Sequence, residues 1–126
     1  MTARILIVDD NPTNLKLVAY LMRANGYDVD TAADADAAVA CIAAHRPRLM
    51  LLDLQLPGVD GLELTRRLKV DPKTRDIIIV AVTAYAMKGD EDRARAAGCD
   101  DYVTKPIDTR GLPALVARLI ATRESA

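Results

Sequence analysis

The sequence predicts a single doubly wound α/β domain, in which five parallel strands are covered on both faces by five helices. Two observations lead to this fold class. Short apolar runs of strand length alternate along the chain with segments of helical periodicity, a pattern typical of parallel sheets with helical crossovers. Three of the runs are apolar at every position, which indicates strands buried on both faces.

The expected strands follow these runs in chain order. The three continuous runs cover residues 5–8, 49–52 and 77–82, and we expect them in the centre of the sheet. Residues 28–31 and 101–104 are more polar, so we place them nearer the edges. For such a sheet we expect the strand order 2-1-3-4-5, in which the order reverses between the first and third strands.

Helical segments fill the intervals between the strands. The first begins at Asn11-Pro12, an N-cap followed by proline at the first helical position, and ends at Asn25-Gly26. The second covers residues 34–45, with Val39 and Ile42 expected to face inward. The other three are a segment marked by Leu62, Leu64 and Leu68 that closes before Asp71-Pro72, residues 86–97, and a stripe from Leu112 to Ile120.

Two of these helices have unusual sequences. Residues 86–97 carry charges and alanines but almost no large apolar side chain, so we expect this helix to be the most loosely held. The last helix has Pro113 near its start. If Asp108 caps that helix, the proline falls past the first turn and removes a hydrogen bond, so we expect a start one or two residues later or a 3₁₀ turn.

Length and composition restrict the function. The 126 residues suffice for one domain, expected to span 1–126 with a core of 4–121 and a short tail over 122–126. Seventeen Lys and Arg balance 18 Asp and Glu, and the chain has no Trp or Phe, so nothing favours binding to nucleic acid. The first apolar run is too short for a signal peptide or a membrane span. We therefore expect a soluble cytoplasmic protein with two reduced cysteines and no membrane partner.

Polar residues that could take part in a reaction or bind a ligand lie at the ends of four of the expected strands. Asp9 and Asp10 follow the first, Asp53 follows the third, Thr83 ends the fourth and Lys105 follows the fifth. Ligand sites in open α/β sheets form beyond the carboxyl ends of the strands, where the strand order reverses. We therefore expect the three carboxylates to lie together.

A cluster of three carboxylates needs a compensating charge, since the groups repel one another. Hard oxygen ligands suit Mg²⁺, which fills its remaining positions with water and phosphate oxygens. With the ammonium of Lys105 and the hydroxyl of Thr83, the set contains the parts needed for phosphoryl transfer to a carboxylate.

Three stretches of the chain resemble, in order and spacing, the receiver domain of response regulators, the phosphoacceptor module of two-component signalling. They are ILIVDDNPTN, LMLLDLQLPGVDGLEL and IIIVAVTAYAMKGDEDRARAAGCDDYVTKPID. The resemblance covers nearly the whole chain. It implies the flavodoxin-like receiver fold and a protein that catalyses only its own phosphorylation and dephosphorylation, without an output domain of its own.

The resemblance also implies a phosphoacceptor and a metal site. Asp53 would accept a phosphoryl group from a phosphohistidine on a sensor histidine kinase or a histidine phosphotransfer protein. Mg²⁺ would be bound by Asp9, Asp10 and Asp53, and by the backbone carbonyl of Gln55.

Residues that would bind the phosphoryl group and transmit its presence are implied as well. Thr83, Ala84 and Lys105 would contact the phosphoryl oxygens, and Pro106 would follow a cis peptide bond. Thr83 and Tyr102 would turn inward together on phosphorylation. The face made by the fourth helix, fifth strand and fifth helix would then dock a downstream protein, with the receiver a monomer or a phosphorylation-dependent dimer.

Two residues near the expected phosphoacceptor bear on the lifetime of the phosphoryl group. In receivers, the residues at the positions of Gln55 and Tyr85 flank the route of the attacking water. Their bulk here suggests a persistent acyl phosphate.

Three alternatives remain open at this stage. A receiver from a hybrid kinase, which passes phosphate to a histidine phosphotransfer protein, would have the same motifs. A small aspartyl-nucleophile phosphohydrolase would need a second acid where Gln55 stands and an insertion that covers the substrate. A flavin-binding electron carrier would need a phosphate-cradling loop after the first strand, where this chain has the acidic segment Asp9-Asp10-Asn11-Pro12.

Overall fold

A computed structural model of the chain describes residues 3–56, 58, 60–84 and 89–125. It contains one sheet of five parallel strands in the order β2-β1-β3-β4-β5, which confirms the expected topology. The strands are β1 (Arg4–Val8), β2 (Asp28–Ala32), β3 (Leu49–Asp53), β4 (Ile78–Thr83) and β5 (Asp101–Thr104). As expected, the two more polar strands, β2 and β5, form the edges of the sheet.

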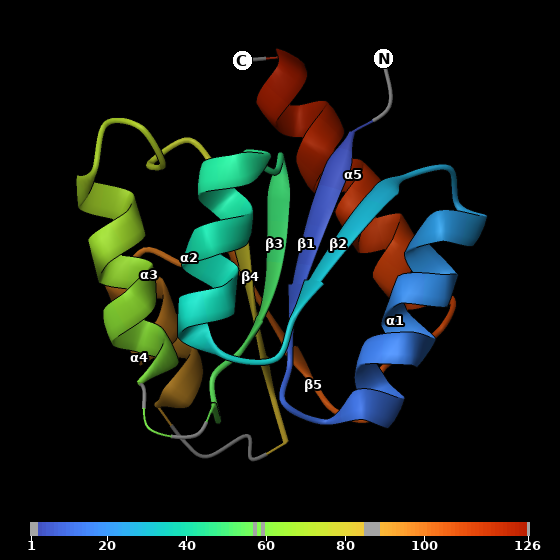
Figure 1. The fold of residues 1–126 in the computed structure, drawn as a ribbon, viewed down its shortest axis with the longest axis horizontal. Coiled ribbons are helices and arrows are strands. Elements are labelled where there is room, and N and C mark those ends of the chain that lie inside the picture. The colour runs from blue at the N-terminus through green and yellow to red at the C-terminus, as the bar shows by residue number, and fades with distance from the viewer. Residues whose placement is uncertain (1–2, 57, 59, 85–88, 126) are drawn as a thin grey trace.

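Among the described residues, five helices cover the two faces of this sheet (Figure 1). They are α1 (Pro12–Ala24), α2 (Ala35–Ala44), α3 (Gly61–Val70), α4 (Asp90–Ala97) and α5 (Gly111–Ser125). Residues of α2, α3 and α4 pack on one face of the sheet, and residues of α1 and α5 pack on the other. Within the described part of the chain, no helix has both the length and the apolar character needed to cross a membrane.

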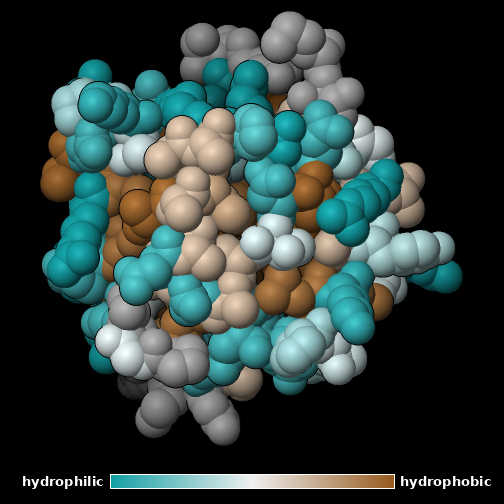
Figure 2. Space-filling view, viewed as in Figure 1, coloured by the Kyte–Doolittle hydropathy of each residue, from teal (hydrophilic) through white to brown (hydrophobic). Residues whose placement is uncertain are grey.

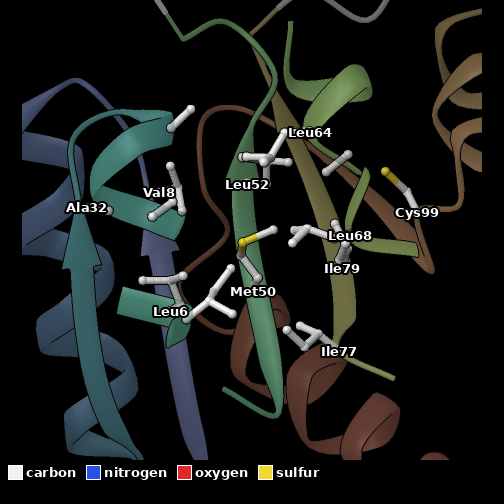
Figure 3. Packing of buried hydrophobic residues seen from close by; sticks show 14 of the residues in the cluster. Leu6, Val8, Ala32, Met50, Leu52, Leu64, Leu68, Ile77, Ile79 and Cys99 are labelled. Atoms are coloured by element: carbon white, nitrogen blue, oxygen red, sulfur yellow. The ribbon is translucent and has the colours of Figure 1, made fainter. Parts of the chain in front are cut away.

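The core consists of two aliphatic layers separated by the sheet. Leu6, Met50 and Ile79 of the central strands face α2 and α3 (Figure 3). Their neighbours in sequence point the opposite way, toward α1 and α5. Successive side chains of a strand alternate between its faces, so burial on both sides requires apolar residues at every position.

The expectation that Val39 of α2 faces inward is wrong. The buried stripe of this helix is Ala35, Ala38 and Ile42, which follows the spacing of a single helical face. Val39 lies beside that stripe and is 50% exposed. In a helix this rich in alanine, the sequence contains too few large side chains to determine which face is buried.

Pro113 delays the start of regular hydrogen bonding in α5, as expected. The backbone carbonyl of Asp108 accepts a hydrogen bond from the N–H of Leu112 at 2.9 Å, as at the beginning of a helix. Pro113 has no N–H for the next bond of this series, so the regular helix starts only at Gly111. It then runs to Ser125, so the segment expected as a tail continues the helix.

The short helix α4 begins at Asp90, whereas the sequence suggested residue 86, and residues 86–88 lie outside the described part of the chain. Glycines with positive φ stand at both ends, Gly89 at 90° and Gly98 at 112°. Only Ala94 and Ala97 of α4 are buried. This helix therefore removes little apolar area from water, although its mobility stays a prediction.

Asp100 joins several elements at the amino ends of the strands. Its Oδ2 accepts hydrogen bonds from Nζ of Lys69 and from the backbone N–H of Ile79, each at 2.8 Å. Its Oδ1 accepts one from Arg123 at 3.1 Å. The Lys69 ammonium also donates to the carbonyl of Ile77 at 2.8 Å. A single carboxylate therefore links α3, β4 and α5 at the end of the sheet opposite its carboxyl edge.

Candidate functional site

Three carboxylates meet at the carboxyl edge of the two central strands. Asp9 directly follows β1 and Asp53 is the last residue of β3; the register of these neighbouring strands pairs Val8 with Leu52. The residues that come next are therefore adjacent. One carboxylate oxygen from each of Asp9, Asp10 and Asp53 lies within 4.8 Å of the others. Asp9 and Asp53 are buried, whereas Asp10 is exposed to solvent.

An ammonium group from the end of β5 reaches this cluster. Nζ of Lys105 lies 3.0 Å from Oδ2 of Asp53 and 3.4 Å from Oδ2 of Asp9. The backbone N–H of Lys105 donates to the carbonyl of Thr83 at 2.8 Å, which extends the pairing of β4 with β5 and fixes the base of the lysine. The peptide bond between Lys105 and Pro106 is cis.

The backbone of each loop fixes the other oxygen of each buried carboxylate. Oδ1 of Asp53 accepts a hydrogen bond from the N–H of Gln55 at 2.9 Å, and Oδ1 of Asp9 accepts one from the N–H of Asn11, also at 2.9 Å. Both are turns in which an Asp side chain binds the N–H two residues on. The role of Asn11 was missed in the sequence, although its spacing from Asp9 repeats that of Gln55 from Asp53.

The charges of the site are unevenly balanced. Three carboxylates and one ammonium give a formal sum of −2. Burial raises the pKa of Asp9, and the neighbouring charge of Asp53 adds to this, against the opposing effects of the Asn11 hydrogen bond and of Lys105. Burial alone would lower the pKa of Lys105, but the hydrogen bond and charge of Asp53 and the charge of Asp9 outweigh it, so this pKa is raised.

The donor set fits Mg²⁺. Every acidic group offers a hard oxygen ligand, and Asp10 opens the cluster to solvent, so water and phosphate oxygens have access to a bound cation. A divalent cation would also cancel the excess negative charge. Asp9, Asp10 and Asp53 are the residues that would hold it.

Asp9→Asn is expected to stabilise the fold near neutral pH in the presence of a chelator. A folded-state pKa above the unfolded value of 3.8 means that ionised Asp9 lowers the free energy of unfolding above the folded pKa. Asparagine removes this cost while keeping an oxygen acceptor for the N–H of Asn11. The gain should therefore be full above the folded pKa and vanish as the pH falls to the unfolded value.

Urea unfolding between pH 7 and pH 4 measures this difference. Added Mg²⁺ should stabilise wild type more than the variant and reduce or reverse the order. A less stable Asp9→Asn protein at pH 7 in chelator would contradict the expectation.

The remaining predicted site residues lie on β4, β5 and the loop after β3. Thr83 is the last residue of β4 and is buried. The N–H of Ala84 donates to Oε1 of Gln55 at 3.4 Å, a side-chain contact that the sequence did not reveal. Tyr102 of β5 packs against the core layer beneath α2, α3 and α4; its buried hydroxyl has no hydrogen-bond partner among the described residues. Tyr85 lies outside the described part of the chain.

A doubly wound sheet with paired acids, a buried aspartate and a lysine at its carboxyl edge defines a receiver. Residues 5–117 match the response regulator receiver domain, and the chain belongs to this family. The resemblance recognised in the sequence is thereby confirmed. Membership also decides against the small phosphohydrolase and the flavin carrier, because the family consists of signalling domains.

Known relatives agree with this assignment. The polar-differentiation response regulator DivK of Brucella ovis is 47% identical over 107 residues, which cover 85% of this chain and 87% of that protein. A CheY-like receiver domain protein from Methanospirillum hungatei JF-1 is 31% identical, with a TM-score of 0.90 over 99% of this chain and 98% of that one. The receiver domain of a histidine kinase from Syntrophus aciditrophicus is 31% identical, with a TM-score of 0.87 over 96% and 92%. Both forms of receiver considered for the sequence therefore occur among its relatives.

Proposed function

We propose that this receiver accepts a phosphoryl group on Asp53 in a Mg²⁺-dependent reaction, from a phosphohistidine of a sensor histidine kinase or a histidine phosphotransfer protein. The strongest support is the environment of Asp53 itself. Asp53 is 2% exposed, with one carboxylate oxygen held by the N–H of Gln55 and the other by Lys105. Two further carboxylates suited to Mg²⁺ lie within 4.8 Å.

The transfer requires little chemistry from the protein beyond position and charge. An oxygen of Asp53 forms a bond to phosphorus as the nitrogen–phosphorus bond of the donor breaks, and the electron pair remains on the imidazole nitrogen. Lys105 is protonated near neutral pH, since the ordinary lysine pKa of 10.5 lies far above 7 and the neighbouring carboxylates of Asp53 and Asp9 raise this pKa further. It holds Asp53 in place before neutralising charge on the phosphoryl oxygens. Bound Mg²⁺ would supply positive charge that offsets the three adjacent carboxylates.

The switch in this proposal involves residues at the ends of β4 and β5. The hydroxyl of Thr83 and the N–H of Ala84 bind the phosphoryl group, and the amide of Gln55 releases that N–H. Tyr102 responds to the movement of Thr83 and alters the face formed by α4, β5 and α5, where a downstream protein docks. Gln55 and Tyr85 shield the acyl phosphate from water. The protein acts in the cytoplasm, as a monomer or a phosphorylation-dependent dimer.

Intact mass spectrometry tests the proposal directly. With Mg²⁺ and acetyl phosphate, wild type should gain one phosphoryl group in an acid-stable, base-labile bond. Asp53→Asn should gain none, whereas Asp76→Asn, which changes an exposed residue with a 74% exposed side chain, should behave as wild type. A chelator should abolish the gain. An equal gain in Asp53→Asn, or none in wild type, would contradict the proposed function.

A further inference from the structure

A groove with an apolar floor separates α2 from α3. In Figure 2 this face of the molecule shows hydrophobic surface along α2, bordered by hydrophilic groups. The groove consists of two hollows that share Val39. Ile42 and Leu68 line one hollow and Leu64 lines the other. Half-exposed Val39 is therefore a projecting apolar side chain with a hollow on either side, and we name the whole surface the α2–α3 groove.

The two ends of the groove carry opposite charge. The hollow nearer the carboxyl edge of the sheet is lined by three carboxylates and one guanidinium, a formal sum of −2; these groups belong to Asp36, Asp60, Glu63 and Arg67. The hollow at the other end is lined by two cations and one carboxylate, a formal sum of +1; these belong to Arg46, Lys73 and Asp71. The groove is thus a dipolar surface with an apolar middle.

We propose that a second copy of this chain docks on the α2–α3 groove about a two-fold axis that passes beside Val39. This axis lies in the plane of the interface and perpendicular to the helices, so the helices of the two copies run antiparallel. The acidic end of each groove then faces the basic end of the other. Val39 of each copy enters a hollow beside Val39 of its partner, so the same surface supplies both the projection and the cavity.

Charge selects this arrangement over others. A parallel arrangement would place acidic end against acidic end, which opposes association. A partner of different sequence would need a charge gradient opposite to that of the groove, and a second copy turned through the two-fold axis has that gradient without further assumption. The inference is independent of the proposed function, because it requires neither phosphate nor Mg²⁺.

The size of the face predicts a weak dimer. Each of the two helices has ten residues, so each is about 15 Å long, and the pair presents a face of roughly 300 Å². Stable complexes bury about 800 Å² per partner. Association should therefore depend on concentration. The face formed by α4, β5 and α5 belongs to other elements and remains accessible in such a dimer.

Sedimentation velocity of the unphosphorylated chain in chelator, over a wide concentration range, tests the proposal. The average mass of wild type should rise toward that of a dimer. Val39→Asp should weaken association at least tenfold. Val70→Asp is the matched control, because Val70 is an 80% exposed valine of α3 that does not line the groove, and it should associate as wild type.

Charge substitutions provide a second readout on exposed residues, which folding should tolerate. Asp36→Lys and Lys73→Asp should each weaken the dimer, and the protein with both changes should recover much of the association, since each site faces the opposite end of the partner's groove. A protein that is monomeric throughout the range would overturn the proposal. So would a dimer that persists in Val39→Asp, or one in which the two charge changes fail to compensate.

Discussion

Lys105→Met is expected to accept a phosphoryl group from acetyl phosphate about 100-fold more slowly than wild type. The ammonium lies 3.0 Å from the oxygen of the proposed nucleophile and 3.4 Å from Asp9, and the Lys105 side chain is only 18% exposed. Groups positioned in this way at a developing charge contribute roughly 100-fold or more to a rate. Methionine keeps most of the volume of the side chain and removes the charge together with the hydrogen bond to Asp53.

Mg²⁺ binding should not be weakened by the same substitution. Loss of one positive charge changes the formal sum of the site from −2 to −3 while leaving all three carboxylates in place. The rise in melting temperature on addition of Mg²⁺ should therefore be at least as large as in wild type. Lys73→Met, at an exposed position at the opposite end of the sheet, is the control for both measurements.

A Lys105→Met protein that is phosphorylated at the wild-type rate would exclude this role for the ammonium. Melting curves recorded with Mg²⁺ separate a slow but folded protein from an unfolded one. The rate is followed by intact mass over time.

Asp100→Ala is expected to lower the free energy of unfolding by about 3 kcal/mol. The change leaves the Lys69 ammonium, whose side chain is only 17% exposed, without its carboxylate partner. It also removes the acceptor of the Ile79 N–H and the carboxylate partner of Arg123. Removing one member of a partly buried network lowers the free energy of unfolding by more than the lost ion pair had contributed to it, because the groups left behind remain desolvated.

Urea unfolding of matched variants measures this cost. Asp76→Ala is the control, since the Asp76 side chain is 74% exposed and its carboxylate lies 3.9 Å from Arg46; this change should alter stability by no more than about 0.5 kcal/mol. Asp100→Asn should fall between the two, because its amide oxygen can still accept from Ile79. Equal losses for Asp100→Ala and Asp76→Ala would show that the network contributes little.

Hydrophobic periodicity predicted the sheet and much of the site because both depend on where strands end. Parallel pairing brings residues that follow paired strand ends to one edge, so Asp9 and Asp53 are neighbours for the same reason that Val8 pairs with Leu52. Contacts without periodicity could not be predicted. Lys69 looks like any surface lysine of a helix until the fold brings Asp100 to it.

One wrong prediction and one missed contact arise because the sequence carries little information about them. The inward-facing side of an alanine-rich helix is decided by the packing of small residues, which is why Val39 was assigned to the wrong face. The Gln55 side chain reaches Ala84 across a gap between two loops, and no spacing along the chain indicates that contact.

The buried hydroxyl of Tyr102 has a consequence for the relative populations of its rotamers. A desolvated hydroxyl without a partner among the described residues costs about 1–3 kcal/mol, and this offsets part of the free energy gained by packing the ring. The buried placement of this hydroxyl is thus favoured less than the packing of the ring alone suggests. A difference of about 1.4 kcal/mol changes the ratio of two conformers tenfold, so one hydrogen bond gained or lost by this hydroxyl is enough to shift the populations of the ring's orientations.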